Sequence, residues 1–217
     1  MNAKYIFIDA TFKSAPPHFK QILHIIAIDT RTNLAVLVST CFMQSKDSGM
    51  YQSILEDLKV KVSESGGILE PHTVLCDFEK SIHIAIKSKL PKSKILGCYF
   101  HLLKSWWKKA SKLGLRTKSK LATTKDMMMK LKILVHLPQQ YREEYFKAVQ
   151  NFYDINSIET KFLEYIQTYY ISHSNKSFSY ALDYLNNFDP SNEEIIRTNN
   201  ILEGKSFKFI FNEIDRI

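Results

Sequence analysis

Apolar residues in the first hundred positions form short compact runs separated by turn residues and helical patterns. Strands are expected over residues 5–8, 21–28, 34–40, 73–76 and 94–99. Residues 29–33, between the second and third runs, are turn-forming and suit a tight hairpin. Apolar residues recur at helical spacing over about 47–65 and 78–89, and Gly66 and Pro91 prevent these helices from continuing. The predicted order is β-β-β-α-β-α-β.

The period changes at Phe100, and strand signals disappear after it. Helices are expected over residues 100–113, 120–136, 139–152, 155–171 and 176–186. Residues 187–191 read as a break, and a last helix is expected over about 193–212. The chain is therefore predicted to combine an α/β part with a block of helices.

The composition is that of a folded globular protein. Of 217 residues, 45% are hydrophobic and 24% charged, with only 6 Gly and 6 Pro, which argues against a disordered tail. No stretch approaches the roughly 20 apolar residues of a membrane span, and no basic-then-apolar leader opens the sequence. The three cysteines are expected to be reduced thiols. Cytosol or nucleus is the default compartment, and no membrane partner is expected.

The charge is strongly basic, with a formal net charge of +8 and a pI near 9.2, which favours a polyanionic partner. The stretch 104–120 holds seven basic residues and no acidic one: Lys104, Lys108, Lys109, Lys112, Arg116, Lys118 and Lys120. From charge alone, a solvated helix face is as good an interpretation as a phosphate-contacting surface.

Two acidic residues follow short apolar runs, Asp9 after the first and Asp77 after the fourth. They are 68 positions apart (77 − 9), but neighbouring strand ends in a mixed sheet can bring them together. Two close carboxylates repel each other unless a cation lies between them, and Mg²⁺ prefers such ligands. A third carboxylate would complete a two-metal site for phosphodiester chemistry. The plainer alternative for each Asp is a turn or helix-capping residue.

Four motifs follow one another along the chain: IDATFK at 8–13 (with Pro17 and FKQ at 19–21 after it), LCDFE at 75–79, GCYFH at 97–101 and RTNNILEG at 197–204. Together they resemble, in the same order, segments of the Mutator-like element (MULE) transposase domain. The first, second and fourth resemble the family segments that carry catalytic Asp, Asp and Glu residues, and the third resembles its Cys-x-x-His motif. One such motif alone would be weak evidence of a relationship. Four motifs in the family's order, which together span nearly the whole chain, are strong evidence.

The resemblance implies a ribonuclease H-like fold, which is α/β with a five-stranded mixed sheet and an all-helical insertion before the last catalytic helix. Residues 1–102 would be the first part of the core, 103–192 the insertion and 193–217 the final core helix. The insertion accounts for the 126 positions (203 − 77) between Asp77 and Glu203. Asp9, Asp77 and Glu203 would be the catalytic carboxylates and would bind two Mg²⁺ or Mn²⁺ ions.

The activity implied is that of a DDE-type DNA transposase in the nucleus, acting as a possible homo-oligomer. The resemblance implies that water would nick the DNA and that the freed 3′-hydroxyl would then attack target DNA. A non-catalytic DNA-binding or regulatory derivative is the alternative, and a metal-dependent nuclease of the same fold is a third reading. Family members usually carry an upstream DNA-reading zinc module, which eight residues before Asp9 cannot hold, so we expect a core without that module.

Several further residues allow two readings. Glu79 is close to Asp77, but at the start of a helix we favour a capping role. Cys98 and His101 have zinc-like spacing, yet structural zinc needs four ligands, so we expect them beside the carboxylates, near a DNA phosphate or a water. Trp106 and Trp107 are candidates for stacking on DNA bases, although at least one of two adjacent helical tryptophans should pack in the core.

The predicted DNA-contacting surface gathers these tryptophans and the basic residues around them. Its members are Lys104, Trp106, Trp107, Lys108, Lys109, Lys112 and Arg116.

Overall fold

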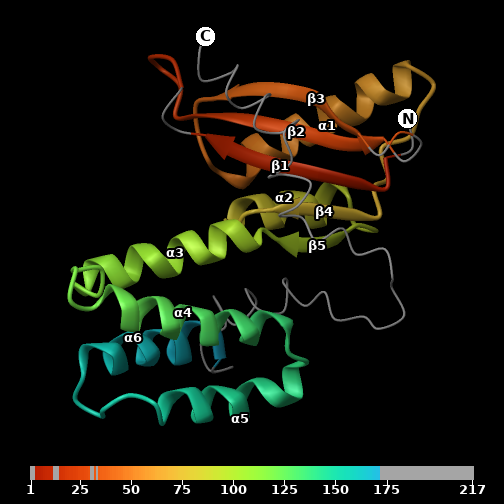
Figure 1. Cartoon of the computed structure of the whole chain (residues 1–217). Helices are drawn as coiled ribbons and strands as arrows, with labels where there is room; N and C mark the ends of the chain where they lie inside the picture. The colour runs from red at the N-terminus through yellow and green to blue at the C-terminus, as the bar shows by residue number, and fades with distance from the viewer. Residues whose placement is uncertain (1–2, 12–14, 30–31, 33, 172–217) are drawn as a thin grey trace. The chain divides into compact units, whose positions relative to one another are not determined.

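The computed structural model describes residues 3–11, 15–29, 32 and 34–171. This part of the chain forms two compact units, divided between Cys98 and Tyr99 (Figure 1). We call the first the sheet unit and the second the helical unit, and each is described by itself. The predicted domain bounds remain a prediction, because the final core helix over residues 193–217 lies outside the described residues.

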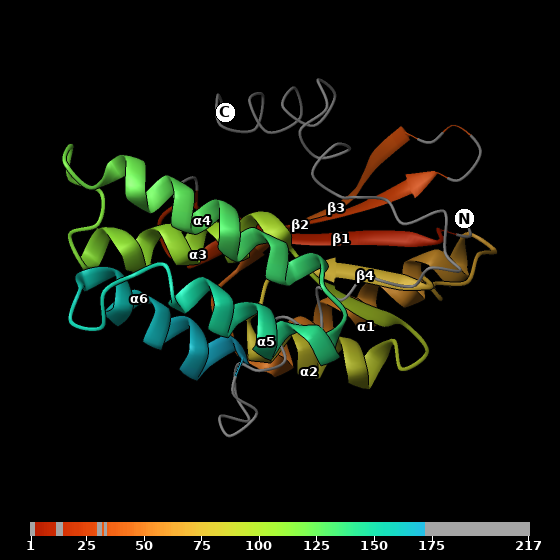
Figure 2. The same cartoon turned by 60° about the horizontal axis from the view of Figure 1, so that its bottom comes forward.

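The sheet unit is built on five strands, as predicted. They are β1 (Tyr5–Thr11), β2 (Gln21–Asp29), β3 (Leu34–Met43), β4 (Thr73–Cys76) and β5 (Lys94–Gly97). Their order in the sheet is β3-β2-β1-β4-β5, so that β1 lies in the middle. The pairs β1–β2 and β2–β3 are antiparallel, whereas β1–β4 and β4–β5 are parallel (Figures 1 and 2). The predicted α/β class with a mixed sheet, compatible with a ribonuclease H-like fold, is confirmed.

The central strands are buried on both faces, which explains why their sequences are continuous apolar runs rather than alternating ones. In β2, every residue from Gln21 to Ile28 is buried. One face of the sheet carries a cluster formed by Phe7, Ile26, Ile28, Leu75, Leu96 and Cys98. Burying these side chains favours the register that aligns them, because a one-residue slip would turn each to the opposite face.

The described part of the sheet unit also contains two helices, α1 (Ser48–Glu64) and α2 (Lys80–Lys89), which pack against each other. Asp47 begins α1 by accepting a hydrogen bond from the amide of Met50 at 2.9 Å. Gly66 follows the end of α1 in the left-handed region, with φ of 74°, which glycine adopts at little cost. The helix predicted over 78–89 begins two residues later, because Asp77 to Glu79 form a loop.

The helical unit contains α3 (Tyr99–Lys112), α4 (Leu121–His136), α5 (Gln139–Gln150), α6 (Ile158–Ile166) and a π-helical turn (Gln167–Ile171). The four α-helices confirm four of the predicted ones. Aromatic and aliphatic side chains fill its core, among them Trp106, Leu115, Met127, Met128, Phe146 and Phe162. No helix among the described residues is long and apolar enough to cross a membrane. The predicted helices at 176–186 and 193–212 lie outside them.

Candidate active site

The register of β1 and β4 places the two predicted aspartates at equivalent positions. The paired residues are Tyr5 with Thr73, Ile6 with Val74 and Phe7 with Leu75. Asp9 and Asp77 each lie two residues beyond the last of these pairs, and both are partly exposed. Neighbouring strands of a sheet are about 4.8 Å apart. The two carboxylates are thus carried by adjacent parallel chains at the carboxyl end of β4, the edge at which open α/β sheets bind ligands.

Asp9 was predicted to end the first strand, and that detail is wrong, because β1 continues to Thr11. The reason is the unequal length of its two neighbours. β2 pairs with β1 as far as Thr11, and Asp9 lies opposite His24, whereas β4 ends at Cys76. Beyond Phe7 the β-ladder therefore continues on one side of β1 only, so that Asp9 is paired with β2 and not with β4.

His24 is the buried cross-strand neighbour of Asp9 and is only 1% exposed. Its Nδ1 lies 3.1 Å from the hydroxyl of Thr40 on β3. Burial lowers the pKa of His24, and the negative charge of Asp9 only partly opposes that shift. The imidazole is therefore neutral near pH 7 and lends no full positive charge to Asp9.

Asp77 is held in place by two hydrogen bonds within the loop before α2. Its Oδ1 accepts the amide hydrogen of Glu79 at 2.8 Å, an arrangement that aspartate side chains commonly make with the residue two positions on. The backbone carbonyl of Asp77 lies 2.8 Å from Nε2 of His83. Because a carbonyl can only accept, Nε2 must carry the proton. Both the side chain and the backbone of Asp77 are thus anchored.

Glu79 occupies the predicted cap position of α2, although its side chain makes no capping hydrogen bond. Its backbone amide donates to Oδ1 of Asp77. The Glu79 carboxylate accepts from the Tyr51 hydroxyl at 3.3 Å, and that hydroxyl accepts from Nε2 of Gln21 at 2.8 Å. Glu79 therefore links α1 and β2 to the loop that carries Asp77.

The environment around Asp77 and Glu79 is electrostatically negative. Burial raises the pKa of Glu79, the charge of Asp77 raises it further, and Lys46 opposes the shift. The charges of Glu79 and Asp77 also contribute to the raised pKa of Tyr51, which burial causes first. A carboxylate close enough to raise the pKa of its neighbour in this way also favours a bound cation.

Sequence reasoning missed Gly97, which supports this loop from β5. A β-carbon at position 97 would lie 2.3 and 2.4 Å from two ring atoms of Phe78, closer than real contacts allow. Phe78, between Asp77 and Glu79, therefore packs directly on the glycine backbone. The sequence signals were a glycine within the fifth predicted strand, where a side chain would otherwise be expected, and its place in the GCYFH motif.

The described residues supply two of the three predicted metal ligands, and Glu203 lies outside them. No group of three or more His, Cys, Asp or Glu side chains in the described part of the chain is arranged to hold a metal ion. The oxygen chemistry of Asp9 and Asp77 is of the kind that hard divalent cations prefer, and Glu203 is predicted to complete the set. Convergence of the three carboxylates stays a prediction.

Cys98 and His101 fall on opposite sides of the boundary between the units. The amide of Cys98 donates to the carbonyl of Cys76 at 2.8 Å and extends the β4–β5 ladder, while His101 is in the first turn of α3. Their predicted place beside the carboxylates therefore stays a prediction. None of the three cysteines forms a disulfide.

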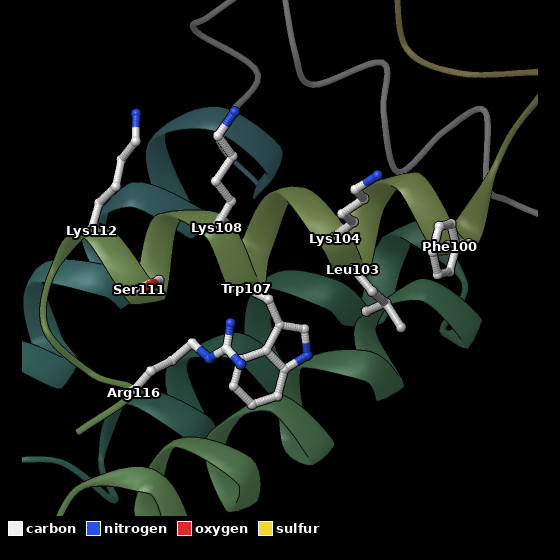
Figure 3. Close-up of a pocket in the computed structure, with 8 residues that line it drawn as sticks. All are labelled: Phe100, Leu103, Lys104, Trp107, Lys108, Ser111, Lys112 and Arg116. Carbon is white, nitrogen blue, oxygen red and sulfur yellow. The ribbon is translucent and has the colours of Figure 1, made fainter. Parts of the chain in front are cut away.

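Five of the predicted DNA-contacting residues line one groove of about 710 Å³ on the helical unit (Figure 3). They are Lys104, Trp107, Lys108, Lys112 and Arg116, accompanied by Phe100, Leu103 and Ser111. Trp106 must be removed from the predicted surface, because it is fully buried and its ring meets Tyr170 edge-on at 5.6 Å. Lys109 lies elsewhere, over the ring of Tyr165 at 4.8 Å.

Comparison with known families gives one finding. Residues 5–105 match the family model of the MULE transposase domain, which confirms the resemblance over that stretch. The match indicates a transposase with DNA as its partner. No curated protein matches the chain at a significant level.

Proposed function

We propose that this MULE transposase domain cuts DNA and joins the cut end to a new site, with Asp9, Asp77 and Glu203 as its catalytic carboxylates. In the first reaction, water attacks phosphorus and the bond to the 3′-oxygen breaks, which leaves a 3′-hydroxyl and a 5′-phosphate. In the second, that 3′-oxygen attacks a target phosphate and displaces its 3′-oxygen. Both steps exchange one phosphodiester oxygen for another, so no covalent intermediate with the enzyme is required.

The observation that carries the proposal is the equivalent placement of Asp9 and Asp77 on β1 and β4. A turn or capping role for both residues would not require that register. Asp9 lies within a strand rather than in a turn, which removes the plainer alternative for it. Asp77 does bond a loop amide through Oδ1, but no hydrogen bond to its Oδ2 is present within the described residues, so a cation can use that oxygen.

The three carboxylates would hold two divalent metal ions, which activate the attacking oxygen and stabilise the leaving one. The chain's own residues contribute rigidity and charge. His83 and the Glu79 amide fix Asp77, and the chain of hydrogen bonds from Gln21 through Tyr51 fixes Glu79 beside it. Fixed carboxylates avoid reorganisation during the reaction, which is where such sites gain most of their rate.

The test uses the purified full chain and supercoiled plasmid DNA, because conversion to the relaxed circle reports nicking without knowledge of the transposon ends. With Mn²⁺ or Mg²⁺ we expect nicking by the native protein. The isosteric variants Asp9→Asn, Asp77→Asn and Glu203→Gln should each lower the rate by at least about 100-fold, a loss of roughly 3 kcal/mol of transition-state stabilisation. Asp57→Asn is the matched control, since Asp57 is exposed on α1 and its ion-pair partner among the described residues is Lys61.

A second readout does not depend on activity. Mn²⁺ should raise the melting temperature of the native protein and of Asp57→Asn, but not that of the Asp9→Asn/Asp77→Asn double variant. The double variant itself should be no less stable than the native protein without metal, because it relieves carboxylate repulsion. Undiminished nicking by either aspartate variant would refute the assignment. Melting curves without metal would identify a variant that fails to nick DNA because it is unfolded.

A further inference from the structure

The groove on α3 has two unlike sides (Figure 3). Helical spacing aligns Lys104, Lys108 and Lys112 along one side, four residues or about 6 Å apart. Leu103 and Trp107 project from the other side, and Arg116 reaches back toward the indole. A row of cations thus runs parallel to an apolar, aromatic floor.

The fold positions the floor through the two faces of α3. Leu102, Trp106 and Ala110, four residues apart, are buried in the helical unit. Trp107 follows Trp106 by 100° around the helix and therefore leaves the core, and it remains partly exposed. Phe100, at the end of the groove, is 53% exposed.

A tight turn after α3 completes the groove. Gly114 has φ of 77°, and the amide of Leu115 donates to the Ala110 carbonyl at 3.0 Å, which ends the helix in the usual glycine-dependent way. Leu115 is fully buried and its carbonyl accepts from the Thr124 hydroxyl at 2.7 Å. The turn is therefore fixed, and it places the Arg116 guanidinium 5.8 Å from the Trp107 ring centre.

Among the described residues, no acidic side chain compensates the positive charge of the groove. The sequence has no Asp or Glu between Glu79 and Asp126. In the part of the chain that the structure describes, no acidic side chain pairs with Lys104, Lys108, Lys112 or Arg116. Like charges four residues apart on a helix destabilise it slightly. Such a row is therefore expected to be neutralised by a polyanion, and phosphates release counterions when they bind it.

We propose that this groove binds an unpaired segment of DNA, with one base stacked on Trp107 and the phosphates following the three lysines. The inference rests on the proposed function for its choice of DNA. Duplex DNA exposes base edges and phosphates but keeps its base faces stacked, so it would meet the lysines and leave the recessed indole unused. An unpaired strand places its backbone on one side and its base faces on the other, as the groove does.

Cutting and joining DNA produces strand ends whose last bases are no longer held in a continuous duplex. A groove that takes up an unpaired base stabilises such an end, because stacking on an aromatic ring offsets the lost stacking in the duplex. An acidic peptide would satisfy the lysines but has no matching planar group for the Trp107–Arg116 pair.

Binding is measured with the full chain and EDTA, using a labelled oligothymidine and a duplex of the same length. Trp107→Ala should weaken single-strand binding about 5- to 150-fold, the range for loss of one stacked base, and change duplex binding less than about twofold. Trp107→Phe keeps a stacking ring and should bind nearly as the native protein does. Lys108→Gln should flatten the salt dependence by about 0.7 in logarithmic slope, whereas Lys118→Gln, outside the groove, should leave it unchanged.

Fluorescence gives an independent readout, since the chain contains only two tryptophans. Oligothymidine should quench the native emission but not that of Trp107→Phe, in which only the buried Trp106 remains. Equal weakening of single-strand and duplex binding by Trp107→Ala overturns the proposal, as does unchanged binding or Trp107-dependent binding of polyglutamate. The binding assays contain no metal, so a negative result in them rejects the groove proposal and does not bear on metal-dependent nicking. Conversely, absence of nicking together with intact single-strand binding rejects only the proposed function.

Discussion

The two units place their functional side chains by different means. In the sheet unit, Asp9 and Asp77 are 68 positions apart (77 − 9) and are carried by adjacent chain segments only because β1 and β4 pair in one register. In the helical unit, the groove lies within residues 100–116, on one helix and the turn that follows it. The first site therefore depends on long-range packing, and the second on local periodicity and one glycine. Substitutions that disturb the strand packing should therefore affect the first site and not the second, and substitutions in α3 or its turn should do the reverse.

The largest effect is expected from the two adjacent tryptophans of α3. Trp106→Ala removes a fully buried side chain and should lower the free energy of unfolding of the helical unit by about 3–5 kcal/mol. Trp107→Ala, one position on, should cost less than about 1 kcal/mol because Trp107 lies at the groove. Urea titration of both variants measures the difference. Similar losses of unfolding free energy in the two variants would mean that Trp107 is part of the core and not of a separate groove.

An intermediate effect is expected at the long-range contact between β5 and the Asp77 loop. Gly97→Ala forces a β-carbon into the Phe78 ring and should cost about 1–3 kcal/mol of stability, as overpacking does. It should also slow metal-dependent nicking, because the ring adjoins Asp77. Single-strand binding by the helical unit should not change.

The control for this contact is a compensating substitution. Phe78→Leu makes room for the new methyl group, so the double variant should be more stable than the sum of the two single changes predicts. Additive costs would show that the Phe78 ring does not transmit the effect of Gly97→Ala.

The smallest effect is expected at two glycines that share the same backbone conformation. Gly66 after α1 and Gly114 after α3 have φ of 74° and 77°, and an added β-carbon would meet nothing within 4 Å at either position. Alanine should therefore cost about 1–2 kcal/mol at both, from backbone strain alone. Only Gly114→Ala should weaken binding of oligothymidine, because only that turn carries Arg116. Equal loss of binding in both variants would contradict the local origin of the groove.

Local signals predicted much of this fold. Thr73–Cys76 was predicted with its observed bounds, and the helices of the helical unit were found from their apolar spacing. Contacts between residues that are distant in the sequence could not be predicted as well. The end of β1 at Thr11 depends on how far β2 continues beside it, and the packing of Phe78 on Gly97 joins residues from different elements. Neither follows from the residues near those positions.

The candidate site shows the same division. The positions of Asp9 and Asp77 followed from strand patterns and motifs, but the bond between Glu79 and Tyr51 could not, because it requires α1 to pack beside the loop. In α3, the sequence indicated that at least one of the two tryptophans is in the core. Choosing Trp106 required knowing which face of the helix meets the other helices.

The three cysteines all belong to the sheet unit, and two of them, Cys76 and Cys98, are buried. Burial raises the pKa of Cys76 well above its ordinary value, so this thiol stays protonated and unreactive while the sheet is closed. Its modification by a thiol reagent therefore requires strands β4 and β5 to open. The rate of Cys76 labelling would therefore measure how often β4, the strand that precedes Asp77, opens. A slower rate with DNA or Mn²⁺ would show that the ligand makes this opening less frequent.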